Sequence, residues 1–227
     1  GIKPDSYFLS ISANKNLISK KWLSKVSKIL RSEQRKFKIV LSGGDTTKST
    51  KLSITIVVLG SSKIKPILRR TCMLNDDIYV TGNIGDSYVG LKILQNKIKT
   101  TKKLKNYFIK KYFEPEIQIK LTTELLKFAN SSIDISDGLI DDLEKMINRQ
   151  KLSYKIFEKK IPISKNLNNY LKKNNLKKSN FISNGDDYQI LFTAGVDKSR
   201  IIEKTSKSLG IKISKIGKIR RNNEKSS

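Results

Sequence analysis

The stretch SIDISDGLIDDLEKMI, residues 132–147, decides the fold of this chain and carries much of its chemistry. Ser132–Ile135 is short and alternates isoleucine with polar residues, which predicts a strand. From Gly138 to Ile147 the apolar residues recur three and four positions apart, which predicts a helix with one buried face. We therefore expect a strand, a tight turn and a helix, with acidic and hydroxyl residues gathered in the turn.

That turn offers oxygen ligands beside the start of a helix. Because side chains alternate along a strand, Asp134 and Ser136 are expected on one face. Asp137 falls where the helix begins, and Ser136 or Asp137 is expected to cap it beside backbone N–H groups that attract anions. Two carboxylates, a hydroxyl and a helix N-terminus suit a metal–nucleotide complex. The alternative is a structural N-cap next to a buried polar pair.

Three other glycine-containing turns carry aspartate: SGGDTT at 42–47, GDS at 85–87 and NGDD at 184–187. With the turn at 134–138 they hold six of the twelve aspartates, all at expected strand ends or helix starts. Aspartate fits a tight turn, and its carboxylate can hold a hard cation while nearby N–H groups face a phosphate. SGGDTT has the composition of a phosphate cradle but not the GK[ST] of a Walker A motif. The alternative is that these are ordinary turn residues.

The residue types that are missing narrow the possible chemistry. The 227 residues include no histidine and one cysteine, Cys72, which excludes Ser-His-Asp and Cys-His catalysis and an intrachain disulfide. A metal must then bind to oxygen ligands, which points to Mg²⁺. No apolar run approaches the roughly 18 residues of a transmembrane helix, and we expect a cytoplasmic protein.

The net charge of +27 comes from 39 lysines and only 8 arginines. Specific recognition of phosphates and bases favours arginine, whose planar fork binds in a bidentate way. Abundant lysine, isoleucine and asparagine together indicate codon drift in an AT-rich genome, and Lys102–Lys111 and Leu171–Lys178 are then solvated faces. The alternative is a basic patch that binds nucleic acid.

The order of expected elements is mixed, which predicts an α+β fold. A linker at Gly60–Pro66 predicts a boundary between an N-terminal domain at 1–60 and a C-terminal α+β domain at 61–219, with a polar tail at 220–227. The remaining expected strands are Asp5–Ser12, Phe37–Leu41, Leu52–Leu59, Asp77–Thr81, Leu152–Phe157, Tyr188–Thr193 and Lys212–Ile219. The remaining expected helices are Trp22–Leu30, one after Gly82 with Asp86 or Ser87 as its N-cap, Leu121–Ala129, Ser164–Lys172 and Ser199–Leu209, the last closed by Gly210.

Several of these motifs, taken in their order along the chain, resemble those of a known family. SGGDTT, then LSITIVVLG, DDIYVTGNIGDSYVGL, IDISDGLIDDL and NGDDYQILFT follow one another as in thiamine-monophosphate kinase. That family belongs to an ATP-binding superfamily that also includes aminoimidazole ribonucleotide synthetase and selenophosphate synthetase. The likeness runs from about residue 1 to residue 219 and implies a two-domain PurM-like architecture whose first domain, 1–60, is incomplete. It also implies a chain truncated at the N-terminus and at the C-terminus.

The resemblance implies ATP-dependent phosphorylation of thiamine monophosphate to thiamine diphosphate, by direct phosphoryl transfer assisted by Mg²⁺ and without a side-chain base. By position, Gly44 and Asp45 are expected to meet ATP, and Asp45 also Mg²⁺. Arg69 is expected at the ATP phosphates and Ser136 at ATP. Asp134 and Asp137 are expected to hold Mg²⁺, and Asp186 to lie on the thiamine side. We expect the three metal-binding aspartates to converge on one crevice.

The chain also departs from the family pattern. The acidic blocks that precede this region in the family are absent, which leaves open whether this chain alone is active. The usual GGDDYEL has asparagine at Asn184 and glutamine at Gln189. Full-length relatives are expected to form homodimers. Two alternatives remain: another or degraded member of the superfamily that binds nucleotide without turnover, and a basic nucleic-acid-binding protein.

Overall fold

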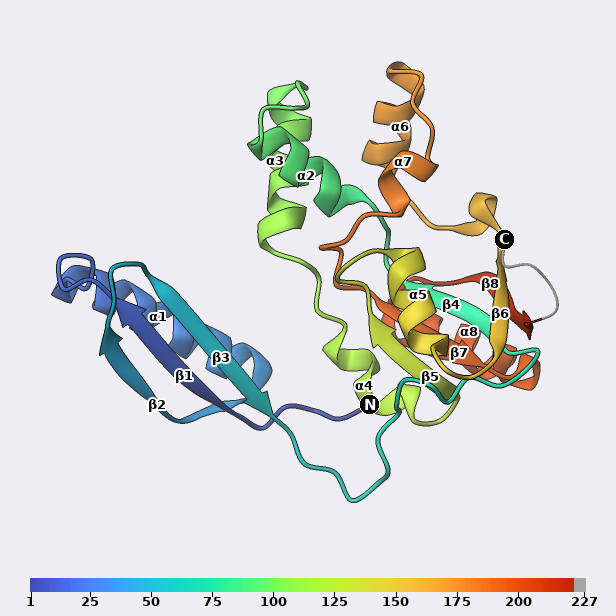
Figure 1. The fold of residues 1–227 in the computed structure, drawn as a ribbon, viewed down its shortest axis with the longest axis horizontal. Helices are drawn as coiled ribbons and strands as arrows, with labels where there is room; N and C mark the ends of the chain where they lie inside the picture. The colour runs from blue at the N-terminus through green and yellow to red at the C-terminus, as the bar shows by residue number, and fades with distance from the viewer. Residues whose placement is uncertain (223–227) are drawn as a thin grey trace. The chain divides into compact units, whose positions relative to one another are not determined.

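The computed structural model describes residues 1–222, which form two compact units (Figure 1). The first unit is Ile2–Pro66, and the second begins at Ile67 and also includes Gly1. Of the predicted polar tail at 220–227, residues 223–227 lie outside the described residues. Arg220 and Arg221 belong instead to the last strand.

The first unit is a three-stranded sheet with one long helix. Its elements are β1 (Ser6–Ala13), α1 (Lys20–Phe37), β2 (Val40–Lys48) and β3 (Ser53–Leu59). The strand order is β2-β1-β3, with β1 parallel to β2 and antiparallel to β3. The predicted strands at 5–12 and 52–59 are confirmed, whereas the strand predicted at 37–41 begins only at Val40, because α1 continues to Phe37.

SGGDTT lies inside strand β2, so the predicted turn at 42–47 is wrong. The register pairs Leu9 with Gly44 and Ser10 with Asp45, after an irregularity at Tyr7 and Phe8. A Cβ atom at Gly44 would lie 1.8 Å from the Leu9 carbonyl oxygen. Close pairing with β1 therefore explains the glycine that the sequence alone assigned to a loop.

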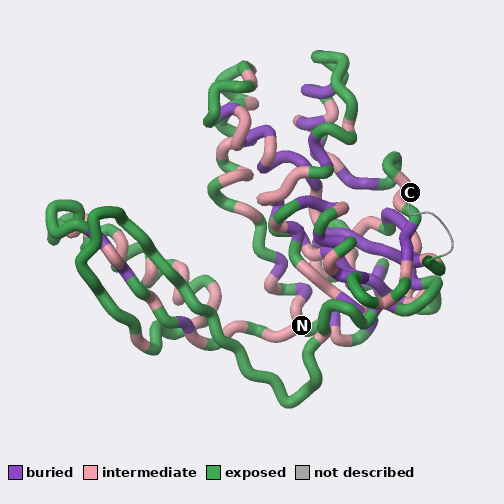
Figure 2. The backbone as a smooth tube through the Cα atoms, in the orientation of Figure 1, coloured by how far each residue is buried: buried purple, intermediate pink, exposed green. Residues whose placement is uncertain are grey.

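The first unit buries little apolar surface. Only Tyr7, Ile11 and Ala13 are buried among its apolar residues, and α1 has no fully buried residue (Figure 2). The Gln34 amide of α1 donates a hydrogen bond of 3.1 Å to the Tyr7 hydroxyl, which ties the helix to β1. β3 is exposed along its whole length although it reads SITIVVL.

The second unit is built on a five-stranded antiparallel sheet of order β5-β7-β4-β8-β6. Its strands are β4 (Asp77–Thr81), β5 (Ala129–Asp134), β6 (Leu152–Ile156), β7 (Ile190–Ala194) and β8 (Ile213–Arg221). Its helices are α2 (Asp86–Leu94), α3 (Lys102–Phe113), α4 (Thr122–Leu125), α5 (Leu139–Ile147), α6 (Lys165–Lys173), α7 (Ser179–Ile182) and α8 (Ser199–Leu209). The expected α+β class is confirmed.

Helices cover both faces of this sheet. Leu139, Leu143 and Met146 of α5 pack with Ile78 of β4 and Leu191 of β7 on one face. A second core on the other face unites α8 and α4 with the sheet through Ile202, Leu125, Tyr79 and Phe192. Neighbouring strand residues thus point to opposite cores, as the pleat requires. Figure 2 shows the buried residues concentrated in these layers.

The remaining helices α2, α3, α6 and α7 form a third apolar cluster around Phe108. The helix α3 was not expected, because its lysine-rich sequence hides the pair Leu104 and Phe108 that packs inward. Thr101 caps it, and most of its lysines are exposed as expected. Within the helix predicted over Leu121–Ala129 the structure has only the four-residue helix α4, and β5 begins at Ala129.

Within residues 1–222 no helix is long and apolar enough to cross a membrane.

Candidate functional site

The turn between β5 and α5 presents two exposed carboxylates. Asp134 ends β5, where it pairs with Ile190 of β7, and its side chain is exposed. Asp137 lies three residues later and is also exposed, with the partly buried Ser136 between them. Gly138, at φ 149°, precedes the first residue of α5. The strand, turn and helix predicted from 132–147 are confirmed, and they bring these three predicted residues together.

The N-terminus of α5 is already occupied by a carboxylate of the chain itself. Asp142 Oδ2 accepts hydrogen bonds from the backbone N–H groups of Ser136 (2.9 Å), Asp137 (2.9 Å) and Gly138 (3.1 Å). These three N–H groups are therefore not free to bind an external anion, and the expected cap by Ser136 or Asp137 is wrong. Gly138 is the N-cap residue, and Asp142 from the first turn supplies the acceptor.

A second loop closes over this turn. The Asp186 N–H donates to the Ser136 carbonyl oxygen (3.0 Å), and the Tyr188 N–H donates to that of Ile135 (2.8 Å). A Cβ atom at Gly185 would lie 1.9 Å from the Ser136 carbonyl oxygen, so only glycine permits this approach. Asp186 and Tyr188 both have positive φ, 67° and 50°. The loop places Asp186 against the turn, and its predicted contact with thiamine stays a prediction.

The same loop buries Asp187, which the sequence analysis did not assign to the site. Asp187 accepts hydrogen bonds from the backbone N–H groups of Gly85 (2.7 Å) and Ser87 (3.4 Å) at the start of α2. The N-cap residue is Gly85, so the predicted cap by Asp86 or Ser87 is wrong. Asp86 is also buried, and its carboxylate accepts from Ser164 Oγ (2.7 Å) and the Tyr107 hydroxyl (2.8 Å).

These two acids line a small polar cavity of about 30 Å³. Its walls are formed by Asn83, Asp86, Ser87, Lys111, Pro115, Glu116, Asp187 and Gln189. Burial raises the pKa of Asp187 to about 7 despite its backbone hydrogen bonds. Burial likewise raises the pKa of Asp86, which Ser164, Tyr107 and Lys111 only partly offset. This part of the fold therefore holds at least one carboxyl group that binds its proton unusually tightly.

Three predicted ligands lie elsewhere. Gly44 and Asp45 are exposed on β2 in the first unit, so their part in one site with Asp134 and Asp137 stays a prediction. Arg69 is exposed in the second unit, next to Leu68. The Leu68 carbonyl oxygen accepts from Ser131 Oγ (3.0 Å) and from the Ser132 N–H (3.3 Å), which places Arg69 along the edge strand β5.

The donors present at the β5–α5 turn fit a magnesium ion bound together with a phosphate ligand. Among the described residues no group of three or more acidic or cysteine side chains could hold a metal by itself. Mg²⁺, however, retains several waters and is often held by one or two carboxylates and substrate phosphates. Asp134 and Asp137 supply such a pair of hard oxygen ligands.

Comparisons with known proteins were made by sequence and by structure. A thiamine-monophosphate kinase of Buchnera aphidicola from Schizaphis graminum is 38% identical over 222 residues, covering 95% of this chain and 64% of that protein. That of Buchnera aphidicola from Acyrthosiphon pisum is 37% identical over 212 residues, covering 90% of this chain and 64% of its own length. No protein-family model matches. The chain thus spans about 64% of the length of these relatives.

The comparison with solved structures finds relatives of the same kind. The crystal structure of thiamine-monophosphate kinase from Stenotrophomonas maltophilia superposes with a TM-score of 0.86 at 26% identity, covering 97% of this chain and 70% of that one. The fold is that of the PurM-like superfamily. Within that superfamily, the chain is similar to thiamine-monophosphate kinases over at least 90% of its own length and 64% of theirs. The predicted family resemblance is confirmed.

Proposed function

We propose that this chain takes part in the ATP-dependent phosphorylation of thiamine monophosphate to thiamine diphosphate. The observation that carries the proposal is the pair of exposed carboxylates, Asp134 and Asp137, beside Ser136 and under the Asn184–Tyr188 loop. Relatives at 37% and 38% identity are thiamine-monophosphate kinases, which supports the reaction and both substrates.

The residue types suit a reaction in which both donor and acceptor are phosphates. Mutual repulsion of these anions opposes their approach, and Mg²⁺ held by Asp134 and Asp137 would neutralise part of that charge. A phosphate acceptor is already an anion, so the chemistry does not require a strong side-chain base. We therefore assign none and propose that Ser136 and Arg69 bind ATP, with Asp186 on the thiamine side.

The first unit is proposed to add Gly44 and Asp45 as further contacts for ATP, and Asp45 as a further ligand of Mg²⁺. Both residues are exposed on β2, where a ligand can reach them. Replacement of Asp45 by Asn is expected to weaken Mg²⁺-dependent ATP binding. If ATP binds equally well to the Asp45→Asn variant, this part of the proposal fails.

The test of the reaction is product formation. The chain is incubated with ATP, Mg²⁺ and thiamine monophosphate, and thiamine diphosphate is measured by chromatography after conversion to its fluorescent thiochrome. Product is expected from the unmodified chain and from the control Asp197→Asn, an exposed acid in the turn before α8. Product is not expected from Asp137→Asn. ATP binding without any product would favour a nucleotide-binding relative without turnover.

We also propose that the chain forms a homodimer through β3. The sheet face opposite Tyr7 and Ile11 exposes Phe8, Val57 and Leu59, and β3 is an unpaired edge of the described sheet. An apolar edge strand of this kind favours pairing with an identical copy across a two-fold axis. Light scattering is expected to give the mass of a dimer, and Val57→Lys that of a monomer. The control Thr50→Lys adds the same charge at an exposed position and is expected to remain dimeric.

A cytoplasmic location completes the proposal, because the ATP that such a kinase consumes is available there. Cell fractionation is expected to recover the protein with cytoplasmic enzymes, and recovery with membranes would contradict this.

A further inference from the structure

Lys145 differs from the other lysines of the chain in its partners. Within residues 1–222, it alone forms ion pairs with two carboxylates: its Nζ atom lies 2.8 Å from Asp142 Oδ1 and contacts Asp137 Oδ2. The other lysine ion pairs each involve a single acid. The charge of Lys145 is thus directed at the turn that carries the proposed metal ligands.

Asp142 fixes where this ammonium group lies. The Asp142 side chain is only 1% exposed, and its Oδ2 atom already accepts three backbone hydrogen bonds. Burial by itself would raise the pKa of Asp142, but the hydrogen bonds from Lys145 and the backbone outweigh it and hold the pKa below its usual value. Asp142 is therefore ionised, and its side chain cannot rotate without losing the hydrogen bonds that hold residues 136–138 in place.

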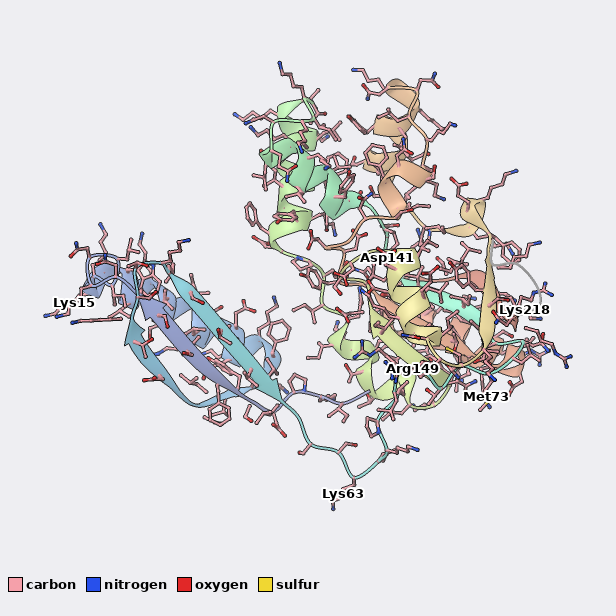
Figure 3. All side chains as sticks on the ribbon, in the orientation of Figure 1. Lys15, Lys63, Met73, Asp141, Arg149 and Lys218 are labelled. Carbon is pink, nitrogen blue, oxygen red and sulfur yellow. The ribbon has the colours of Figure 1, made fainter. Side chains whose placement is uncertain are left out.

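Of the two carboxylates that pair with Lys145, that of Asp137 is the one that solvent can reach. Its side chain is 65% exposed, against 41% for Lys145, and it opens onto a groove on the outer side of α5. Asp141, which Figure 3 labels in the first turn of α5, is another residue that lines this groove. An ion entering from solvent can therefore reach Asp137, while Asp142 stays covered.

We propose that Lys145 is a positioning residue that holds the Asp137 carboxylate when no metal is bound, and that a divalent cation displaces it. This inference rests on the proposed function, in which Asp137 is a ligand of Mg²⁺. The ammonium group and the metal ion need the same carboxylate oxygen and repel each other, so Lys145 competes with Mg²⁺ for Asp137. After displacement the ammonium group stays paired with Asp142 and remains beside the turn.

The test is a calorimetric titration of the chain with MgCl₂ alone. Lys145→Gln removes the competing charge, and we expect Mg²⁺ to bind about two- to fivefold more tightly, the range that an exposed ion pair contributes. Lys145→Arg keeps the charge and is expected to bind Mg²⁺ no more tightly than the unmodified chain. Lys177→Gln makes the same change of charge at an exposed position and is expected to have no effect.

The outcomes separate this inference from the proposed function. Unchanged or weaker Mg²⁺ binding by Lys145→Gln, together with loss of binding by Asp137→Asn, overturns the role of Lys145 and leaves the metal role of Asp137 intact. Full Mg²⁺ binding by Asp137→Asn overturns both. No Mg²⁺ binding by the unmodified chain overturns the displacement of Lys145 by the cation, but not a Mg²⁺ site that a phosphate ligand completes.

A second measurement does not depend on the fold of the glutamine variant. In the unmodified chain, the side-chain ¹⁵N resonance of Lys145, identified by its absence in Lys145→Arg, is expected to shift as Mg²⁺ is added. A resonance that stays in place through saturation with Mg²⁺ contradicts displacement.

Discussion

Replacement of Asp187 by Asn is expected to flatten the pH dependence of stability in the second unit. Burial raises the pKa of Asp187 to about 7, against roughly 3.9 for an exposed aspartate. Between these two values the folded chain holds a proton that the unfolded chain has released, so raising the pH favours unfolding. At about 1.4 kcal/mol per pH unit, the unmodified chain should lose about 2 kcal/mol between pH 5 and pH 7 through this group.

The chain has no histidine, so no other side chain has an ordinary pKa between pH 5 and pH 7. Burial also raises the pKa of Asp86, which adds an effect of the same sign. Burial lowers the pKa of the amino terminus, which acts in the opposite direction and is common to every variant. The difference between the variant and the unmodified chain therefore reports Asp187 together with its electrostatic effect on Asp86.

The assay is urea unfolding followed by far-ultraviolet circular dichroism at pH 5, 6 and 7. Asp187→Asn is expected to reduce the loss of stability across this range, because its amide does not titrate. The control Asp197→Asn, on an exposed turn, should keep the slope of the unmodified chain. An unmodified chain whose stability rises from pH 5 to pH 7, or a variant with an unchanged slope, would refute a raised pKa at Asp187.

Two further substitutions test how the turn is built. Asp142→Ala leaves three backbone N–H groups without their acceptor and removes one of the two carboxylates that pair with Lys145. It should lower the free energy of unfolding by about 3 kcal/mol, measured by urea titration, and a loss below about 1 kcal/mol would contradict the structural role of Asp142. Gly185→Ala places a Cβ atom 1.9 Å from the Ser136 carbonyl oxygen. It should speed amide hydrogen exchange at Asp186 and Tyr188 by at least tenfold. Unchanged exchange would show that the loop can move aside.

Local sequence patterns predicted the elements whose apolar spacing is strong. The helix α5 and the helix α8 with its terminal Gly210 follow from such spacing and from the turn residues that bound them. SGGDTT was misassigned because a glycine-rich segment is typical of a turn, while the actual reason for Gly44 is its close approach to β1. That contact joins residues far apart in the sequence, and no local pattern reports it.

The residues of the candidate site also differ in whether the sequence alone could predict their positions. Asp134, Ser136 and Asp137 are neighbours in sequence, so their proximity could be predicted. Asp187 caps α2 from about a hundred residues away, which only the fold brings about. Asp142 could have been found, because an acid in the first turn of a helix is a frequent partner for the free N–H groups there. Its distance of four residues from Gly138 was the available signal.

The most direct test of the central claim is a titration of the chain with ATP, with and without Mg²⁺, in the unmodified protein and in Asp137→Asn. We expect ATP binding that depends on Mg²⁺ in the unmodified chain and is lost, or weakened by at least tenfold, in the variant. Equal binding of ATP by the two proteins, or binding that ignores Mg²⁺, would contradict it.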